Sequence, residues 1–332
     1  MSKNVAVVIL NYNGRDLLKT FLPSVLRFSE EAEIYVADNH STDDSLSVLR
    51  NEFPQVKVIS NKANYGFARG YNEALAAVSA EYYVLLNSDV EVTENWLEPL
   101  ISLLHSNPRI AAVQPKIKAY RDKAKLEYAG AAGGYLDRFG FPFCRGRIFE
   151  DTENDVQQYD DERPVFWASG ACMAIKSSVY LELQGFDDHF FAHMEEIDLC
   201  WRMQHAGYEI YYTFRSTVYH LGGATLNKSN PRKTYLNFRN NLLMLYKNAP
   251  GFPLLFLPKL IFDGVAGLHF LMKGEASNCW AIVKAHYYFY THFWKHRRTP
   301  NRIRSTNIYP GSIVTAAFIK GKKKFSDLNW LR

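Results

Sequence analysis

The chain has 332 residues, of which 47% are hydrophobic and 22% charged. This composition is typical of a globular protein and excludes disordered and fibrous classes. The four cysteines form no C-x-x-C pair, so the sequence predicts neither a disulfide framework nor a zinc knuckle, and a reducing, cytoplasmic setting fits best. The apolar stretch at residues 5–10 is too short for a signal peptide and lacks a cleavage site, so we expect no export by that route.

The net charge of +5 is distributed unevenly along the chain. Residues 252–332 carry 13 Lys and Arg against 3 Asp and Glu, whereas residues 1–251 carry 26 against 31. The C-terminal part is therefore strongly basic, and the rest of the chain is acidic. A basic segment that follows an acidic body predicts an anionic surface as the partner of that segment.

Residues 1–115 alternate short β-rich runs with helical patterns. This alternation is typical of βαβ units around a parallel sheet. Helix starts are indicated by Ser41-Thr-Asp-Asp44 and by Thr93-Glu-Asn-Trp96, each followed by apolar residues at helical spacing. The predicted strands are residues 5–10, 33–37, 56–59, 82–86 and 110–113.

Polar residues stand just past the ends of three predicted strands, where open parallel sheets bind their ligands. Asn11 follows the first strand, and Asp38 and Asn39 follow the second. This pair could hold a base or ribose, or could form an Asx turn that opens the next helix. Asn87-Ser-Asp89 follows the fourth strand. An isolated Asp89 suits a hard divalent cation, or could cap a turn.

Residues 116–163 are rich in Gly and aromatic residues, which predicts a hairpin followed by a mobile loop at 150–163. That loop could close over a bound substrate and exclude water. Residues 165–175 read as one strand, and residues 193–207 as a helix closed by Gly207.

Three acids, Glu195, Glu196 and Asp198, fall within one turn of that helix. Asp198 and Arg202 share a face and can pair, which leaves Glu196 free. Crowded carboxylates raise one another's pKa and favour a proton acceptor at neutral pH. The alternative is that these acids only complement the helix dipole.

His220 follows a predicted strand at 208–212 and precedes Gly222-Gly223. A histidine in such a loop can reach a metal through its neutral imidazole. The alternative is a loop histidine that makes a backbone hydrogen bond.

Two aromatic-rich helices are predicted beyond Pro250, at residues 253–272 and 277–296. Pro258, Lys259, Asp263 and His269 interrupt the first, so it has no run of about 18 uncharged apolar residues and we expect no membrane-spanning helix. An interfacial helix flanked by the basic runs 295–298 and 322–324 and an ordinary helical subdomain remain as alternatives.

Several nucleotide and nucleic-acid motifs are missing from the sequence. No G-x-G-x-x-G follows the first strand and no G-x-x-x-x-G-K-[ST] occurs, which argues against a dinucleotide dehydrogenase and a P-loop NTPase. The basic residues lie outside the α/β part and no recognition motif accompanies them, so we expect no nucleic-acid partner.

The segments taken together, and in this order, resemble the family 2 glycosyltransferases of GT-A fold, in the rhamnosyltransferase-like and galactofuranosyltransferase-like branch. The resemblance covers residues 5–239. It is carried by Val7-Val-Ile-Leu-Asn-Tyr-Asn13, Asp38-Asn-His-Ser-Thr-Asp-Asp-Ser45, Asn64-Tyr-Gly-Phe-Ala-Arg-Gly-Tyr-Asn72, Leu86-Asn-Ser-Asp89, Ser169-Gly-Ala-Cys-Met173, Gly185-Phe-Asp187, Glu195-Glu-Ile-Asp-Leu-Cys-Trp-Arg202 and His220-Leu-Gly-Gly223.

The resemblance implies an α/β GT-A fold, with a Rossmann-like, mostly parallel central sheet flanked by helices and a C-terminal helical extension. The implied parts are a nucleotide-sugar-binding and catalytic domain at 1–250 and a basic, aromatic-rich helical region at 251–332. The implied nucleotide-binding residues are Asn11, Asp38, Asn39, Asn64, Gly66, Asn72, Asn87 and Ser88.

The family's D-x-D metal motif appears here as Asn87-Ser88-Asp89, which leaves Asp89 as its only carboxylate. His220 matches the family's late metal ligand, so the resemblance implies Mg²⁺ or Mn²⁺ on Asp89 and His220. The family's E-D-x-D segment corresponds to Glu195, Glu196 and Asp198, with Glu196 in the place of the usual Asp base. Processive members carry Q-x-x-R-W; the glutamine is missing before Trp201-Arg202, which disfavours polymer extrusion.

The implied activity is an inverting, metal-dependent, non-processive sugar transfer. It would run from a UDP- or dTDP-sugar to a hydroxyl of a saccharide acceptor, often lipid-linked, in cell-surface polysaccharide synthesis on the cytoplasmic face of the inner membrane. A GT-A domain that binds nucleotide sugar or glycan without turnover is the main alternative. A sugar-phosphate nucleotidyltransferase would need a Gly-rich basic loop after the first strand, and Asn11-Tyr-Asn-Gly-Arg15 matches this poorly. A purely structural membrane-attached protein would not need polar groups at successive strand ends.

Overall fold

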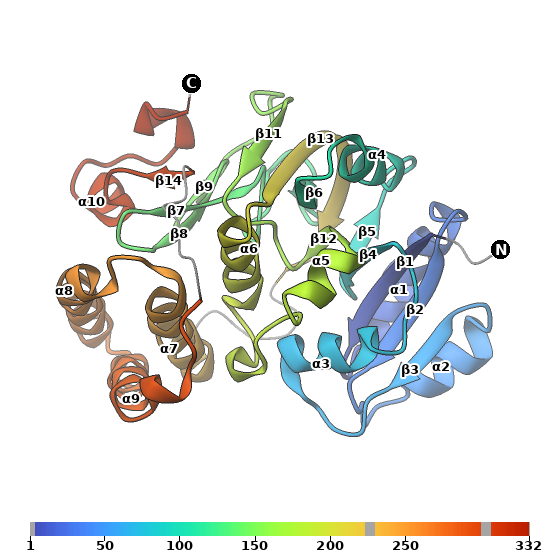
Figure 1. Cartoon of the computed structure of the whole chain (residues 1–332), viewed down its shortest axis with the longest axis horizontal. Helices are drawn as coiled ribbons and strands as arrows, with labels where there is room; N and C mark the ends of the chain where they lie inside the picture. Colours follow the sequence, from blue (N-terminus) through green and yellow to red (C-terminus); the bar gives the residue numbers. More distant parts are fainter. Residues whose placement is uncertain (1–3, 223–229, 300–306, 332) are drawn as a thin grey trace.

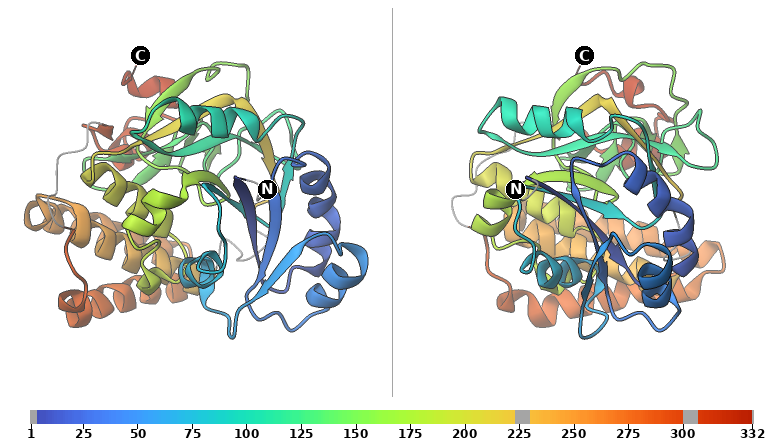
Figure 2. Two further views of the ribbon diagram at one scale, coloured as in Figure 1. Left: turned by 45° about the vertical axis from the view of Figure 1, so that its right-hand side comes forward. Right: turned by 90° about the vertical axis from the view of Figure 1, so that its right-hand side faces the viewer.

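The computed structural model describes residues 4–222, 230–299 and 307–331. A large mixed sheet forms the centre, with helices on both faces, and a smaller sheet and a group of C-terminal helices lie at the end away from β1–β3 (Figure 1). Figure 2 shows the same layers from two further sides.

The large sheet has the strand order β11-β13-β6-β12-β4-β1-β2-β3, and β5 pairs with β13. Its strands are β1 (Val5–Asn11), β2 (Glu33–Asp38), β3 (Lys57–Ser60), β4 (Tyr82–Asn87), β5 (Val90–Val92), β6 (Ile110–Ala119), β11 (Glu162–Val165), β12 (Cys172–Lys176) and β13 (Glu209–His220). The helices are α1 (Arg15–Arg27), α2 (Ser45–Glu52), α3 (Gly66–Leu75), α4 (Glu98–Ser106), α5 (Ser177–Glu182), α6 (Glu195–His205), α7 (Pro231–Asn248), α8 (Phe252–Met272), α9 (Ala276–His292) and α10 (Ile313–Phe318), with short 3₁₀ turns at Asp188–Phe190, Phe293–Lys295 and Phe325–Leu328.

Alternate residues of β1 enter two different cores. Val7 and Ile9 pack with α1, α2 and α4, whereas Ala6 and Val8 pack with α3, α5 and α6. A strand buried on both faces reads as a continuous apolar run, because each face has its own layer of helices. This explains why the β1 sequence, VAVVILN, shows no polar alternation before its last residue.

The first four predicted strands form a parallel block, β3-β2-β1-β4, as the sequence predicts. The other half of the sheet is mixed, because β12 runs antiparallel to both β4 and β6. The single strand predicted at 165–175 is wrong: β11 ends at Val165, and β12 begins at Cys172. The strand predicted at 208–212 is too short, because β13 continues to His220.

The predicted hairpin at 116–163 is part of a second sheet with the order β10-β9-β8-β7-β14. Its strands are β7 (Gly134–Asp137), β8 (Pro142–Cys144), β9 (Arg147–Ile148), β10 (Asp151–Thr152) and β14 (Ile308–Tyr309). The predicted mobile loop at 150–163 is not a free loop. Lys116 and Lys118 both pair with Asp155, Lys116 also pairs with Asp160, and Arg145 holds Asp161 through two hydrogen bonds of 2.6 and 2.8 Å.

The two C-terminal helices predicted from the sequence are confirmed as α8 and α9, and the predicted boundary at 250/251 falls between α7 and α8. The region beyond it also supplies β14, which pairs in parallel with β7. By length and composition alone, α8 could cross a bilayer, although the sequence prediction excluded a span because charged residues interrupt the apolar run.

Candidate active site

The ends of β1 and β2 form one polar edge, because parallel pairing places Asn11 beside Asp38. The Asn11 amide donates hydrogen bonds to Asp38 Oδ1 at 3.1 Å and to Ser41 Oγ at 3.2 Å. Asp38 Oδ2 accepts from the Ser41 backbone N–H at 2.9 Å. Asn11 Oδ1 is buried and has no hydrogen-bond partner within the described ranges, so this edge retains an unused acceptor.

Asn39 fixes the loop that precedes α3. Its amide donates to Asn64 Oδ1 at 3.1 Å and to the Gly66 carbonyl at 2.9 Å, and its Oδ1 accepts from Asn61 Nδ2 and the Tyr65 N–H. Its polar atoms are therefore occupied by the protein, and Asn39 together with Asn64 sets the shape of the loop beside Asp38.

Gly66 has a φ of +76°, and a Cβ there would lie 2.5 Å from the Phe191 carbonyl oxygen. Only glycine allows this close approach of two backbones. Asn72, further along α3, donates to the Phe186 carbonyl at 2.8 Å and to Asp188 Oδ1 at 2.6 Å. These contacts tie the loop after β3 to the segment that leads into α6.

Asp89 and His220 lie side by side although they are 131 residues apart. The antiparallel pairing of β5 with β13 sets His220 opposite Val90, and the Leu221 N–H donates to the Asp89 carbonyl at 3.0 Å. His220 is therefore the last residue of β13 and not a loop residue. Its Nε2 lies 3.1 Å from Asp89 Oδ1. Gly223 of the predicted motif lies outside the described residues.

Asn87 and Ser88, which complete the predicted metal motif, are half-buried at the end of β4. The Asn87 amide lies 3.5 Å from His220 Nε2. Asn87 therefore borders the same pair.

Sequence analysis did not single out Glu127, which completes this cluster. Glu127 Oε2 lies 3.1 Å from His220 Nδ1, on the opposite side of the ring from Asp89. Gly222, with a φ of +66°, allows the chain to pass Glu127, because a Cβ there would lie 2.7 Å from Glu127 Oε1. Burial would lower the pKa of His220, but the two carboxylates raise it to about 10. For Asp89 the directions are reversed: burial by itself would raise the pKa of this carboxyl, but the hydrogen bond from His220 lowers it.

These groups fit a divalent cation by their chemistry. A carboxylate oxygen of Asp89 and the imidazole Nε2 of His220 lie 3.1 Å apart, and the Glu127 carboxylate lies against the other ring nitrogen, as the outer partners of metal-bound histidines do. A cation there would displace the proton from His220 Nε2 and bind the imidazole in its neutral form.

Glu195 and Glu196 open α6 after a strained approach in which Phe191, His193 and Met194 all have positive φ. Strain of this kind gathers at functional sites. Burial, reinforced by the neighbouring Glu196, raises the pKa of Glu195 well above its usual range. Burial raises the pKa of the half-buried Glu196 to about 7. Glu196 Oε2 has no hydrogen-bond partner among the residues described.

Asp198 pairs with Arg202 through a 2.8 Å hydrogen bond from Nε to Oδ2, which confirms the pairing predicted from helical spacing. Asp198 Oδ1 is 2.8 Å from Asn248 Nδ2 and 2.9 Å from Lys247 Nζ. Burial would raise the pKa of Asp198, but Lys247 and Arg202 lower it. Both Asp198 oxygens are thus engaged, so Asp198 joins α6 to α7, whereas Glu195 and Glu196 each keep one buried oxygen with no hydrogen-bond partner in the stretches that the structure describes.

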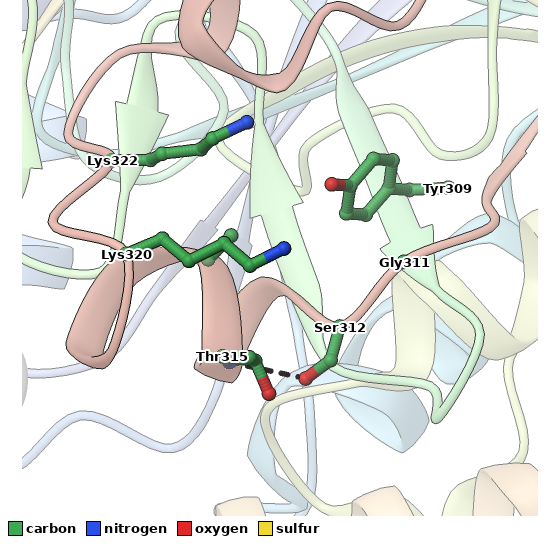
Figure 3. Close-up of a pocket in the computed structure, with 7 residues that line it drawn as sticks. Tyr309, Gly311, Ser312, Thr315, Lys320 and Lys322 are labelled. Carbon is green, nitrogen blue, oxygen red and sulfur yellow. Dashed lines mark hydrogen bonds between the residues drawn. The ribbon is translucent and has the colours of Figure 1, made fainter.

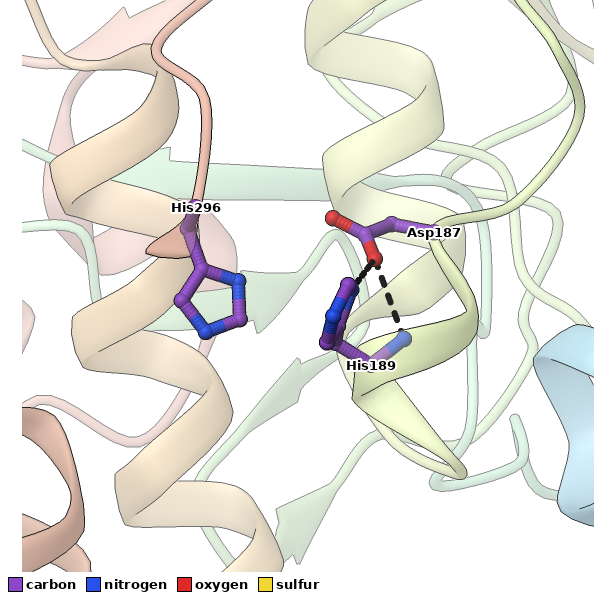
Figure 4. A group of neighbouring side chains, drawn as sticks. All are labelled: Asp187, His189 and His296. Carbon is purple, nitrogen blue, oxygen red and sulfur yellow. Dashed lines mark hydrogen bonds and ion pairs between the residues drawn. The ribbon is translucent and has the colours of Figure 1, made fainter. Parts of the chain in front are cut away.

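Asp187, His189 and His296 form a second group of potential metal ligands (Figure 4). The Lys247 ammonium lies 2.6 Å from Asp187 Oδ2 and supplies a positive charge at that point. Asp187 also accepts a 2.8 Å contact from His189 Nδ1. We interpret this group as an extension of the ion-pair network that joins α6 to α7.

Arg147 is a further buried residue that sequence analysis did not single out. Its guanidinium donates to Cys144 Sγ and to the Phe149 carbonyl, both at 3.3 Å, and its Nε has no partner in the described part of the chain. Burial raises the pKa of the Cys144 thiol, Arg147 lowers it, and the charges of Glu127 and Glu196 make smaller contributions that raise it. The Cys144 thiol therefore lies within electrostatic reach of both Glu127 and Glu196.

A hollow of about 130 Å³ occurs elsewhere, beside α10, and is lined by Tyr309, Ser312, Thr315, Lys320 and Lys322 among others (Figure 3). None of the predicted site residues lines it.

Residues 6–180 match the model of the glycosyl transferase family 2. This is more than half of the chain, which therefore belongs to this family and is a glycosyltransferase.

Among similar proteins, the N-acetylglucosaminyl-diphospho-decaprenol L-rhamnosyltransferase of Mycobacterium tuberculosis is 26% identical over 239 residues, which cover 66% of this chain and 76% of that protein. The rhamnosyltransferase WbbL of Escherichia coli is 27% identical over 219 residues, which cover 63% and 80%.

Two solved structures share the fold. GalNAc-T7, crystallised with UDP, GalNAc and Mn²⁺, has a TM-score of 0.61 at 18% identity and is matched over 75% of this chain and 50% of its own. The mannosyltransferase PcManGT from Pyrobaculum calidifontis, with GDP-Man and Mn²⁺, has a TM-score of 0.54 at 15% identity and is matched over 87% of both chains. The predicted GT-A fold is confirmed.

Proposed function

We propose that this glycosyltransferase moves a hexose from a nucleoside-diphosphate sugar to a hydroxyl of a saccharide acceptor, with inversion at the anomeric carbon and without processive extension. One observation carries the proposal. Glu196 is a half-buried carboxyl with an unused oxygen and a pKa of about 7, which suits a general base that works near neutral pH.

The proposed reaction is a single displacement. The acceptor oxygen bonds to the anomeric carbon while the bond from that carbon to the diphosphate oxygen breaks, and the bonding electrons leave with the diphosphate. Glu196 accepts the proton of the acceptor hydroxyl. Asn11 and Asp38 bind the nucleoside, and Arg147 adds a buried positive charge within electrostatic reach of Glu127. A Mg²⁺ or Mn²⁺ ion on Asp89 and His220 would neutralise charge on the departing diphosphate.

For the donor we propose a rhamnose-like sugar on UDP or dTDP, because relatives in two bacteria are named rhamnosyltransferases. For the acceptor we propose a lipid-linked saccharide in polysaccharide synthesis. The mycobacterial relative is named for such a molecule, N-acetylglucosaminyl-diphospho-decaprenol. The cytoplasmic face of a membrane is the proposed location. The four cysteines are all free thiols, as a reducing compartment requires.

The test is nucleoside diphosphate release from UDP-, dTDP- and GDP-sugars, with Mn²⁺, Mg²⁺ or EDTA, and with a crude lipid-linked acceptor fraction. The variants are Glu196→Gln and Asp89→Ala. Glu52→Gln is the control, because it makes the same exchange in an exposed side chain on α2 that pairs with Lys19.

We expect metal-dependent release from one donor class, with losses of at least about 10²-fold in Glu196→Gln. The anomeric configuration of the purified product, read by NMR, decides the stereochemistry. A retained configuration would overturn the single displacement. Donor binding without release under any condition would favour the binding-only alternative.

A further inference from the structure

The helix α8 presents its aliphatic side chains to the outside of the molecule. One stripe of residues three or four apart is between 58% and 83% exposed, namely Leu254, Leu257, Ile261, Val265, Leu268 and Met272. His269 is the one polar residue among the exposed positions of α8. Contiguous exposed apolar surface of this kind marks a binding face in soluble proteins.

The charged residues of α8 point the other way, into the protein. Lys259 and Asp263 are 2% and 1% exposed and pair with each other, and His286 Nε2 of α9 lies 3.0 Å from Asp263 Oδ2. The Lys259 ammonium also lies 4.4 Å from the centre of the Phe141 ring. A helix at a water-facing surface has the opposite arrangement, with charges outside and leucines inside. The α8 sequence is therefore oriented for an apolar environment on its outer side.

The helix α9 continues the same pattern with aromatic residues. Trp280, Val283, Tyr287 and Tyr290 are exposed at intervals of three or four, and Trp294 follows in the next turn. Trp and Tyr favour the boundary between lipid headgroups and hydrocarbon, because each combines an apolar ring with a polar group. Both helices lie at the end of the molecule away from β1–β3 (Figure 1).

The rim of this surface is basic. Lys273, Lys284, Lys295 and Arg297 are all exposed. The acids between 252 and 298 are Asp263, which is buried and paired, and Glu275, which accepts a 2.7 Å hydrogen bond from Asn278. Positive charge around an apolar stripe complements the anionic headgroups of a bilayer.

We infer that the α8–α9 surface, defined by the exposed stripes above, docks on an anionic lipid bilayer with α8 lying in the plane of the interface. The inner side of α8 packs on the protein: the Phe262 ring lies tilted against Phe139 and edge-on to Phe141, with ring centres 5.2 and 5.5 Å away. A spanning α8 would have to break these contacts and carry the Lys259–Asp263 pair into hydrocarbon, at a high cost in free energy. The inference uses none of the catalytic residues and does not depend on the proposed function.

The test is flotation of the full chain with two kinds of vesicle, phosphatidylcholine alone and phosphatidylcholine with about one third phosphatidylglycerol. The disrupting variant is L257E/I261E/L268E. The matched control is V58E/V156E/L181E, which adds the same number of acids at exposed apolar positions outside α8 and α9. Thermal melting confirms that each variant is folded, and nucleoside diphosphate release is measured separately.

We expect the wild type and the control to float with anionic vesicles, and the disrupting variant to stay at the bottom of the gradient. Replacing Lys273, Lys284 and Lys295 by Gln should weaken vesicle binding about fivefold per lysine. Three results would overturn the inference: flotation unchanged in L257E/I261E/L268E, a dimer by light scattering that this variant abolishes, or protease access in cells showing that α8 crosses the membrane. Failure of the transferase assay with normal flotation would affect the proposed function alone.

Discussion

The pH dependence of turnover tests Glu196 as the base most directly. Because burial raises the pKa of Glu196 to about 7, about half of these carboxyls are ionised at pH 7. Only the ionised form can accept a proton, so the rate should fall as the pH falls. About one tenth of the enzyme carries the base at pH 6 and about one hundredth at pH 5. A carboxyl at the usual value of 4.5 would remain almost fully ionised at pH 6.

Glu195 provides the internal control. Its side chain is buried, and burial together with the neighbouring Glu196 raises its pKa well above the usual range, which disfavours the charged form. Glutamine has nearly the same shape without a charge and is therefore a close substitute. We expect Glu195→Gln to keep nearly wild-type activity and the same pH profile, whereas Glu196→Gln loses about 10²- to 10⁴-fold.

The assay is the initial rate of nucleoside diphosphate release from about pH 5 to about pH 9 at saturating acceptor, with circular dichroism at each pH to confirm folding. A flat profile below pH 7 would refute the reasoning. So would an inactive Glu195→Gln beside an active Glu196→Gln.

Three further predictions concern positioning and stability. Glu127→Gln removes the charge that orients the imidazole of His220, so calorimetric titration should show Mn²⁺ affinity lower by about 10- to 100-fold, and unchanged affinity would exclude this positioning role. Asp198→Ala leaves the buried Lys247 ammonium without one of its two carboxylates, so the free energy of unfolding in urea should fall by about 3–5 kcal/mol; full stability with lost turnover would instead make Asp198 catalytic. Gly66→Ala places a Cβ 2.5 Å from the Phe191 carbonyl oxygen, so the melting temperature should drop and kcat should fall with it, and a variant that melts and turns over like the wild type would contradict the close approach.

The sequence by itself determined the parallel block and the polar groups at its edge. Continuous apolar runs of four to six residues specify β1, β2 and β4, because the burial of both faces leaves no alternation. The edge strand β3 has the sequence KVIS and is largely exposed, so its place in the block follows from the βαβ order of the chain. The pairing of Asp198 with Arg202 was also predictable, since 3.6 residues per turn place positions i and i+4 on one face. Both inferences rest on spacing within one element.

The tertiary structure decided the rest of the site. His220 reaches Asp89 only because β13 extends beyond its predicted end and pairs with β5, and Glu127 arrives from a segment that the sequence predicted as hairpin and loop. The outward orientation of the apolar stripe of α8 could not be predicted either. The sequence gives the positions of Lys259 and Asp263, but not that Lys259 packs on the buried side against Phe141 and that Asp263 pairs there with His286. Local patterns fix a residue's neighbours within a few positions, whereas contacts between residues more than 100 positions apart depend on how whole sheets and helices pack.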